Sequence, residues 1–264
     1  MLIDTHIHLD AAEFDADRGQ VIDAARAKGV AGFVVPAVER ANFDAVRGIA
    51  AENADIGFAL GIHPMYVMQA RMDDVDVLDE FLGEGGAVAV GEIGLDHFVP
   101  GIDHERQLEF FVAQLKLARR HGLPVILHVR RAIDPILKQL RRIGVPGGIA
   151  HAFNGSRQQA DALIGLGFKL GFGGTMSFSG STRIRELAAA LPLGAIVLET
   201  DAPDIPPEWA RGRRNEPANL LRYASILAEL RSATVEEIIA ATGRNAIEVL
   251  RWRPGETPGQ AACD

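Results

Sequence analysis

Residues 123–151 read LPVILHVRRAIDPILKQLRRIGVPGGIAH, and the pattern of this stretch recurs along the whole chain. An apolar run ends at His128, a longer amphipathic stretch follows, and a second apolar run ends at His151. Short apolar runs that alternate with amphipathic stretches are typical of βα units, whose strands form a parallel sheet. Each histidine would then lie where its strand ends.

The same alternation extends in both directions through the 264 residues. The expected strands cover residues 2–5, 32–35, 56–60, 87–91, 125–127, 148–150, 168–171 and 196–200. The clearest helices are expected over residues 104–120, 156–166, 218–230 and 235–251. About eight strands, each followed by a helix, predict an α/β fold with a single (β/α)₈ TIM-type barrel, and a doubly wound open sheet is the alternative.

Length and composition fit one globular domain. A chain of 264 residues is near the usual size of a barrel, and its hydrophobic fraction of 48% and charged fraction of 23% are ordinary. We predict a barrel domain over residues 1–252 and a flexible C-terminal tail over residues 253–264, which are rich in Pro and Gly.

The chain has no obvious targeting or anchoring signal. Its opening MLIDTHIHLD lacks the basic and apolar regions of a signal peptide, and no apolar run is long enough to span a bilayer. The single cysteine, Cys263, cannot form a disulfide within the chain, which indicates a reducing compartment. We therefore expect a cytoplasmic protein that makes no use of a membrane.

The net charge of −8 argues against a broad surface for nucleic acid, which would be basic overall. It leaves room for a small basic patch at an active site. It also fits a protein that gathers carboxylates to hold metal ions.

Histidines mark the ends of the expected strands. Five of the eight histidines lie there: His6, His8, His63, His128 and His151. Closure of a barrel would bring these strand ends round one mouth, where barrel enzymes have their active sites. This convergence favours the closed barrel over the open sheet.

Two carboxylates accompany the first histidines. His6 and His8 are two residues apart, so on an extended backbone they point the same way and can reach one ion. Glu92 follows an apolar run, where a carboxylate is costly unless it is paired or bound to metal; it could bridge two cations or pair with an arginine. Asp201 ends the last strand, next to the first, and could bind the first ion and accept a proton from the attacking water.

His128 and His151, on adjacent strands, are interpreted as ligands of a second ion, although either alone could be a core histidine. Four imidazoles and two carboxylates are thus expected to hold two divalent ions, with Mg, Mn or Zn as the candidates. Paired ions are the usual device of phosphoester hydrolysis. Asp96 is interpreted as a residue that supports a loop or a ligand. Glu199 could form an outward ion pair or support a ligand, and a structural role is favoured.

Basic residues flank the expected mouth: Arg130, Arg131, Arg211, Arg213 and Arg214. Arginine binds phosphate through two parallel hydrogen bonds, although each of these side chains could equally be a solvated loop charge. His63 could contact a phosphate or pack beneath the site. Phe98 and Phe153 are the aromatic residues expected nearby, too few for a long single-strand channel.

Together these motifs resemble the TatD family of metal-dependent deoxyribonucleases, within the metal-dependent hydrolase superfamily. The matching segments are DTHIHLD at 4–10, GIHP at 61–64, GEIGLD at 91–96, PVILH at 124–128, GIAHAFNGS at 148–156 and LETDAP at 198–203. The resemblance implies one ion held by His6, His8, Glu92 and Asp201 and a second held by Glu92, His128 and His151. Asp201 and Glu92 would be the catalytic residues, with Asp201 as the base.

The resemblance also implies a metal-dependent hydrolase of DNA phosphodiesters, acting as a 3′-to-5′ exodeoxyribonuclease. The expected substrate contacts are His63, Arg130, Arg131, Asn154 and Arg213. The chain departs from the family pattern at Val129, Ala152 and Asn154, which line the expected substrate cleft rather than the metal site. The whole pattern is closest to a subgroup described only as metal-dependent hydrolases.

Two other functions remain open from the sequence. An amidohydrolase or a small-molecule phosphoesterase could use the same two-ion site, although many amidohydrolases have a modified lysine where this chain has Glu92. A non-catalytic metal-binding or scaffold protein is disfavoured because all six ligand-type residues are present. DNA or a small phosphoester is the expected partner, and no obligate protein partner is evident, which is compatible with a monomer.

Overall fold

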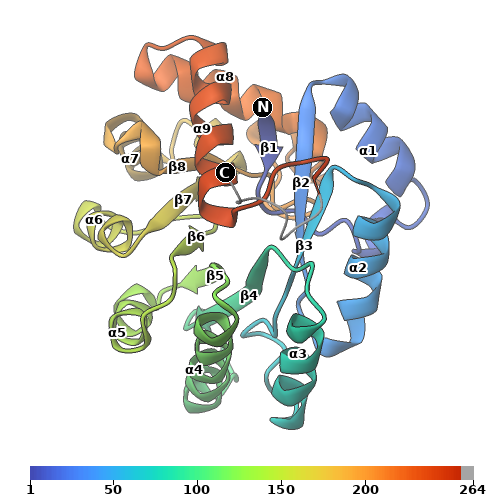
Figure 1. The fold of residues 1–264 in the computed structure, drawn as a ribbon. Coiled ribbons are helices and arrows are strands. Elements are labelled where there is room, and N and C mark those ends of the chain that lie inside the picture. Colours follow the sequence, from blue (N-terminus) through green and yellow to red (C-terminus); the bar gives the residue numbers. More distant parts are fainter. Residues whose placement is uncertain (257–264) are drawn as a thin grey trace, which may run out of the picture.

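In a computed structural model that describes residues 1–256, one eight-stranded parallel sheet runs in the order β1 to β8 and curls into a barrel surrounded by helices (Figure 1). The strands are β1 (Leu2–Asp4), β2 (Val30–Pro36), β3 (Ile56–Leu60), β4 (Ala89–Asp96), β5 (Val125–Arg130), β6 (Gly148–Ala150), β7 (Phe168–Phe172) and β8 (Ile196–Leu198). The predicted (β/α)₈ barrel is confirmed, and the open sheet is excluded.

The long helices are α1 (Arg18–Ala27), α2 (Phe43–Glu52), α3 (Asp73–Gly83), α4 (His104–His121), α5 (Ile133–Ile143), α6 (Arg157–Gly165), α7 (Thr182–Ala190), α8 (Leu220–Arg231) and α9 (Val235–Leu250). Short 3₁₀ helices are η1 (Ala12–Phe14), η2 (Arg40–Asn42), η3 (Gly174–Ser177), η4 (Leu193–Ala195), η5 (Glu208–Ala210) and η6 (Pro217–Asn219). Among residues 1–256, no helix is both long enough and apolar enough to cross a bilayer.

Local signals in the sequence explain where several helices begin and end. Ser156 and Thr234 start α6 and α9 with a reciprocal capping box, in which the side chain of the third helical residue bonds back to the capping residue. The carboxylate of Asp103 accepts the N–H groups of Glu105 and Arg106 at the start of α4. Gly122 ends α4 with φ of 66°, a conformation that costs glycine little.

The eight apolar runs correspond to the eight strands, but four strands extend beyond the predicted ranges: β2, β4, β5, which ends at Arg130 instead of residue 127, and β7, which ends at Phe172 instead of residue 171. β2 begins at Val30 instead of residue 32, and β4 continues to Asp96 instead of ending at residue 91. β4 continues because residues 93–96 pair with residues 127–130 of β5, after a register shift between Val90 and Ile93. Glu92 therefore lies inside a strand rather than at its end.

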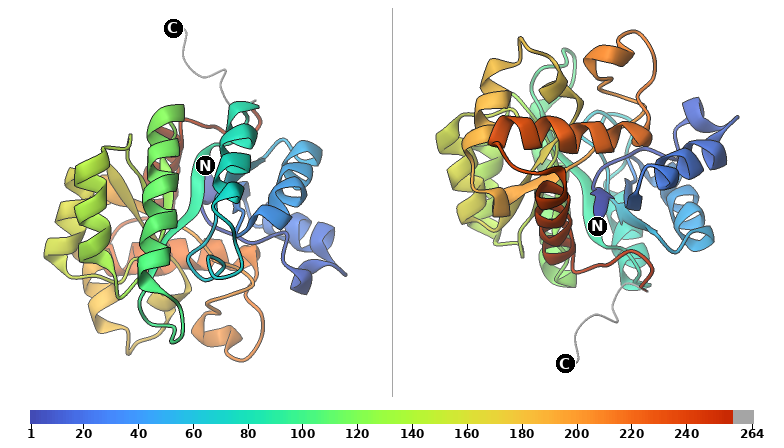
Figure 2. Two further views of the ribbon diagram at one scale, coloured as in Figure 1. Left: turned by 90° about the horizontal axis from the view of Figure 1, so that it is seen from below. Right: turned by 90° about the horizontal axis from the view of Figure 1, so that it is seen from above.

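The base of the barrel, at the N-terminal ends of the strands, is apolar. Side chains from seven strands, and Val88 just before β4, form one buried cluster with α9 and Trp252. Its members are Ile3, Val34, Ala59, Val88, Ala89, Ile126, Ile149, Val197, Ala246, Leu250 and Trp252. α9 lies against β1 and β8 (Figure 1), and α8 crosses it (Figure 2). Gly243 makes this contact possible, since a Cβ there would lie 2.0 Å from the carbonyl oxygen of Met1.

The first residues of the predicted tail contact the barrel. Pro254 is buried against Gly32, where an added Cβ would lie 2.3 Å from its Cγ. The N–H of Gly255 donates to the carbonyl of Ala54 at 2.8 Å. Residues 253–256 therefore extend the packed part of the chain beyond residue 252, and the rest of the predicted tail, 257–264 with Cys263, lies outside the described residues.

Candidate metal centre

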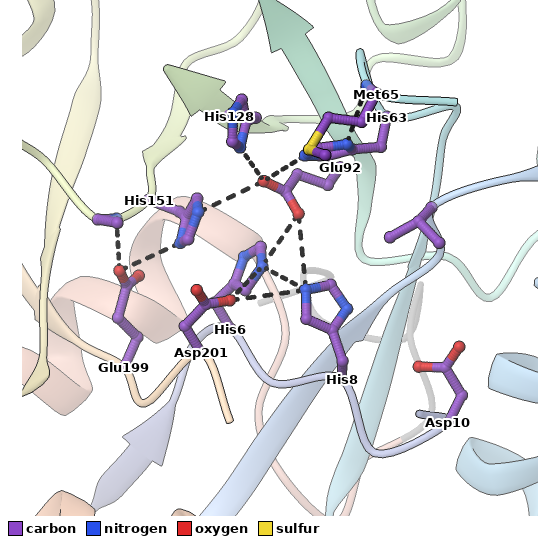
Figure 3. A network of polar contacts seen from close by, with 12 residues as sticks. His6, His8, Asp10, His63, Met65, Glu92, His128, His151, Glu199 and Asp201 are labelled. Carbon is purple, nitrogen blue, oxygen red and sulfur yellow. Dashed lines mark hydrogen bonds and ion pairs between the residues drawn. The ribbon is translucent and has the colours of Figure 1, made fainter. Parts of the chain in front are cut away.

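The mouth of the barrel gathers the six side chains that the sequence singled out (Figure 3). His6 and His8 follow β1, and their Nε2 atoms lie 3.3 Å apart. Asp201 follows β8, and its Oδ1 lies 3.5 Å from Nε2 of His6 and 3.6 Å from Nε2 of His8. The segments after β1 and β8 are joined because the N–H of Asp201 donates to the carbonyl of His6 at 2.8 Å.

Glu92 lies at the centre of the cluster, and its side chain is 2% exposed. Its Oε2 lies 3.1 Å from Nε2 of His6 and 3.8 Å from Nε2 of His8. Its Oε1 lies 3.1 Å from Nδ1 of His128 and 3.4 Å from Nε2 of His151. The two oxygens of one carboxylate therefore face two different groups of imidazoles.

Glycine is required where β4 and β5 approach each other beside Glu92. A Cβ on Gly94 would lie 1.9 Å from the carbonyl oxygen of His128, and a Cβ on Gly91 would lie 2.7 Å from Cβ of Ile126. The glycines of GEIG thus let the two strands pass close together, so that Glu92 and His128 can meet.

His63, which the sequence assigned either to phosphate contact or to packing, belongs to the same cluster. Its side chain is 9% exposed, and its Nε2 lies 3.5 Å from Oε1 of Glu92. Its Nδ1 accepts the N–H of Met65 at 3.2 Å, which fixes the ring. His63, Glu92 and His128 each offer a ligand atom, and these atoms lie within 4.8 Å of one another.

Two further carboxylates hold the outer nitrogens of the histidines. Oδ2 of Asp96 lies 3.0 Å from Nε2 of His128, and Oε1 of Glu199 lies 3.3 Å from Nδ1 of His151. Carboxylates in this position orient metal-binding histidines in many proteins. Glu199, for which the sequence left open an outward ion pair or support of a ligand, is 1% exposed and also accepts the N–H of Ala152, so it points inward beside His151.

Burial and charge shift the protonation of these groups. Burial and the neighbouring His151 lower the pKa of His6 to about 3. Burial alone would lower the pKa of His151 too, but the carboxylates of Glu92, Asp201 and Glu199 raise it to about 10. Burial raises the pKa of Asp201 to about 6, against the lowering effect of nearby histidines.

Glu92 shows the opposite balance. Burial alone would raise its pKa, but the facing imidazoles of His6, His63 and His151 hold the pKa well below its usual range. The cluster therefore gathers buried carboxylates whose charge must be met by protons or by cations.

The cluster fits divalent metal ions. Three triads each bring ligand atoms within 4.8 Å of one another: His6, Glu92, His151; His6, His8, Asp201; and His63, Glu92, His128. Nδ1 of His6 is buried without a hydrogen-bond partner among the described residues. Imidazole nitrogens mixed with carboxylate oxygens are a donor set that suits several divalent metals.

The predicted substrate contacts divide into two groups. Arg130 is the last residue of β5 and Arg131 follows it. Both are exposed, and their guanidinium carbons lie 3.8 and 4.5 Å from the ring centroid of Phe98. Asn154 instead accepts a hydrogen bond from Arg183, and Arg213 donates to the carbonyl of Trp209 at 3.2 Å.

The side chains of two residues near the mouth make their contacts within the protein. Arg214, which the sequence left open as a phosphate ligand or a loop charge, pairs with Asp17 and Glu216. Phe153 is 2% exposed and packs against Phe172, which removes it as a stacking surface. Neither pairing follows a sequence pattern, because each depends on the folded arrangement.

Comparison with known proteins agrees with this architecture. The family model described as TatD related DNase matches residues 3–251. The chain is 40% identical over 246 residues to the Escherichia coli protein described as an uncharacterized metal-dependent hydrolase, YjjV, covering 92% of this chain and 95% of that one. It is 31% identical over 262 residues to human deoxyribonuclease TATDN3, covering 94% of each chain.

The likeness extends to a solved structure. The crystal structure of YjjV, a TatD homologue from E. coli, superposes with a TM-score of 0.92 at 38% identity, covering 96% of this chain and 98% of that one. The name of the E. coli relative describes a metal-dependent enzyme, and the mouth of this barrel supplies clustered His, Glu and Asp side chains that suit divalent metal. This protein belongs to the TatD-related DNase family and is a metal-dependent hydrolase.

Proposed function

We propose that this enzyme hydrolyses phosphodiester bonds of DNA with two divalent ions, removing nucleotides from the 3′ end. The observation that carries the proposal is the position of Glu92, whose two oxygens face two separate groups of imidazoles. A carboxylate in that position suits a bridge between two ions. The human relative's name, deoxyribonuclease, supports DNA as the substrate.

Six residues would hold the ions. His6, His8, Glu92 and Asp201 surround the first position, and Glu92, His128 and His151 surround the second, next to His63. Bound there, paired divalent ions supply Lewis acidity, which activates water near neutral pH and offsets charge on the phosphate. Mg, Mn and Zn each suit some of these ligands.

The protein's own residues would supply the remaining steps. Asp201 would take the proton of the attacking water, since its Oδ1 lies 3.5 Å from Nε2 of His6 and 3.6 Å from Nε2 of His8, where the first ion would be held. Asp96 and Glu199 fix the rings of His128 and His151. Arg130 and Arg131 bind phosphate at the rim.

The footprint on DNA should be short. The chain carries a net charge of −8, and Arg214 is already paired with carboxylates. A protein that neutralised many phosphates would show a steep loss of binding with salt. Attack near a strand end needs only a few such contacts.

Cleavage of end-labelled single-stranded oligonucleotides tests the proposal. With Mg, Mn or Zn, we expect a 5′-labelled strand to give a ladder that shortens from its 3′ end, and a 3′-labelled strand to release labelled mononucleotide at once. Glu92→Gln, which keeps the size of the side chain, should give neither product. Robust hydrolysis of an amide or a small phosphomonoester without cleavage of DNA would assign the site to that chemistry instead.

A further inference from the structure

Phe98 and two arginines form a compact unit at the rim of the mouth. Phe98 follows β4 and is 44% exposed. The guanidinium carbon of Arg130 lies 3.8 Å from its ring centroid, and that of Arg131 lies 4.5 Å away. Within residues 1–256, neither guanidinium pairs with a carboxylate, so their N–H groups remain available to an anion.

Backbone conformation brings the two arginines to one ring. Consecutive residues of an extended strand point to opposite faces. Arg131 has φ of 55°, which turns the chain away from the strand direction directly after Arg130. A bulky residue in that conformation is uncommon, and such outliers cluster at functional sites.

The aromatic ring stabilises two like charges that would otherwise repel each other. A guanidinium over an exposed ring is attracted to it, because the face of the ring carries negative charge density. A ring with two such contacts holds both guanidiniums near one place. The ring of Phe98 therefore positions the guanidinium groups of Arg130 and Arg131.

The unit is connected to the metal centre through Asp96. One oxygen of this carboxylate lies 3.0 Å from Nε2 of His128, and the other accepts the N–H groups of Phe98 at 2.8 Å and Val99 at 3.1 Å. Arg130 follows His128 by two residues, so both start from the same face of β5, about 7 Å apart along the strand. The same carboxylate thus fixes a histidine of the cluster and the loop that carries Phe98.

Carboxylates gather around the segment that follows β3, in contrast to the rim at the end of β5. Tyr66 lies beside His63, and its pKa is raised by burial and by the carboxylates of Glu39, Asp10 and Asp204. An anionic strand crossing the mouth would be repelled there and drawn toward the arginines.

We propose that Phe98, Arg130 and Arg131 form a subsite for the phosphate next to the one that is cleaved, so that the enzyme prefers oligonucleotides over diesters with a single phosphate. This inference rests on the proposed function, since it names the substrate class of the same site. Arg130 and Arg131 contact the substrate, whereas Phe98 is a positioning residue that acts through them.

Paired substrates test the subsite. Kinetics are measured on a short oligothymidylate, which has flanking phosphates, and on bis(p-nitrophenyl) phosphate, which has one. The variants are Phe98→Ala, Phe98→Tyr, the double variant Arg130→Ala/Arg131→Ala, and Arg141→Ala on the exposed face of α5 as the control. We expect the double variant to raise KM for the oligonucleotide by roughly 10–100-fold, the range for lost hydrogen bonds to charged groups.

Phe98→Ala should raise the same KM by roughly 3–10-fold, as two weakened cation–ring contacts would. Phe98→Tyr, which keeps the ring, should restore it. The same variants should raise KM much less for the small diester than for the oligonucleotide, because the diester has no neighbouring phosphate, and Arg141→Ala should change neither value. Equal losses on both substrates would mean that Phe98 serves only to hold the metal centre together, which would overturn the proposal.

A binding measurement separates this inference from the proposed function. Anisotropy of a fluorescein-labelled oligothymidylate is followed against salt in the Glu92→Gln background, where no cleavage is needed. Removing both arginines should lower the magnitude of the slope of log binding constant against log salt by about 0.7, the value for one phosphate contact on a single strand. An unchanged slope overturns the subsite, whereas failure of the wild type to cleave DNA counts against the proposed function alone.

Discussion

The two ends of the barrel are built from the same strands but differ in chemistry. On β5, Ile126 points into the apolar cluster at the base, His128 joins the metal-binding cluster, and Arg130 reaches the rim, each two residues beyond the last. The base is closed by α9 and Trp252 and contains no charged group among its clustered residues in the described part of the chain. Stability and chemistry are therefore separated along the barrel axis, as is typical of barrel enzymes.

Removal of metal should have the largest effect, because it should abolish activity at the mouth of the barrel without unfolding the base. Treatment with EDTA should abolish hydrolysis, because the mouth depends on bound ions, and leave the helical circular dichroism signal, because a chain of this size has its own core. Adding back Mn or Zn should restore the activity. Loss of the helical signal together with activity would mean that the ions hold the fold.

Asp201→Asn should give the next largest effect, confined to the mouth. The amide keeps the shape and one coordinating oxygen but cannot accept the proton. We expect turnover to fall by about 10²–10⁴-fold, the usual range for a general acid–base group, with metal content partly retained. Asp204→Asn, at an exposed position in the same loop, serves as the control. Normal turnover in a fully metal-loaded Asp201→Asn enzyme would refute the assignment of the base.

Trp252→Ala tests the base of the barrel. Its side chain is 3% exposed, and its ring contacts Gly57, where an added Cβ would lie 3.2 Å from two ring atoms. We expect the free energy of unfolding to fall by about 3–5 kcal/mol, as for other buried aromatic residues, while turnover per folded molecule stays unchanged. Urea denaturation followed by fluorescence of the remaining tryptophan measures the loss, with Arg253→Ala as the control. A variant as stable as the wild type would show that α9 alone closes the base.

Metal binding should depend on pH with a definite sign. Neighbouring carboxylates outweigh burial and raise the pKa of His151 to about 10, so the metal-free ring is protonated at neutral pH. An ion needs the neutral ring, so binding must release this proton, and affinity should rise with pH by about tenfold per unit, or 1.4 kcal/mol, until about pH 10. Calorimetric titration in two buffers of different ionisation enthalpy measures the release. Equal heats in both buffers would contradict the release of a proton on metal binding. As a control, His104→Gln should release as many protons as the wild type.

Much of the architecture could be predicted from the sequence because it depends on local patterns. The runs at residues 56–60 and 148–150 match β3 and β6 residue for residue, since each is short, apolar and bounded by turn residues. The end of β4 could not be predicted, because GEIGLD is not an apolar run and its extension depends on pairing with β5.

The same distinction applies to the site. The strand-end positions of His6, His8, His128 and His151 were enough to predict that they meet, because parallel strands end at one mouth. Which carboxylate faces which ring was not predictable. The carboxylate of Glu199 fits beside His151 because Gly171 has no side chain, and it is held there by the N–H of Ala152. The pairing of Arg214 with Asp17 likewise joins residues 197 positions apart.

The position of the bound ions tests the central claim most directly. Crystals soaked in Mn or Zn should show two anomalous peaks about 3.5–4 Å apart, the spacing of two-ion hydrolases, with one oxygen of Glu92 on each. His6, His8 and Asp201 should contact one peak, and His128 and His151 the other. A single peak, or peaks out of reach of Glu92, would contradict the account.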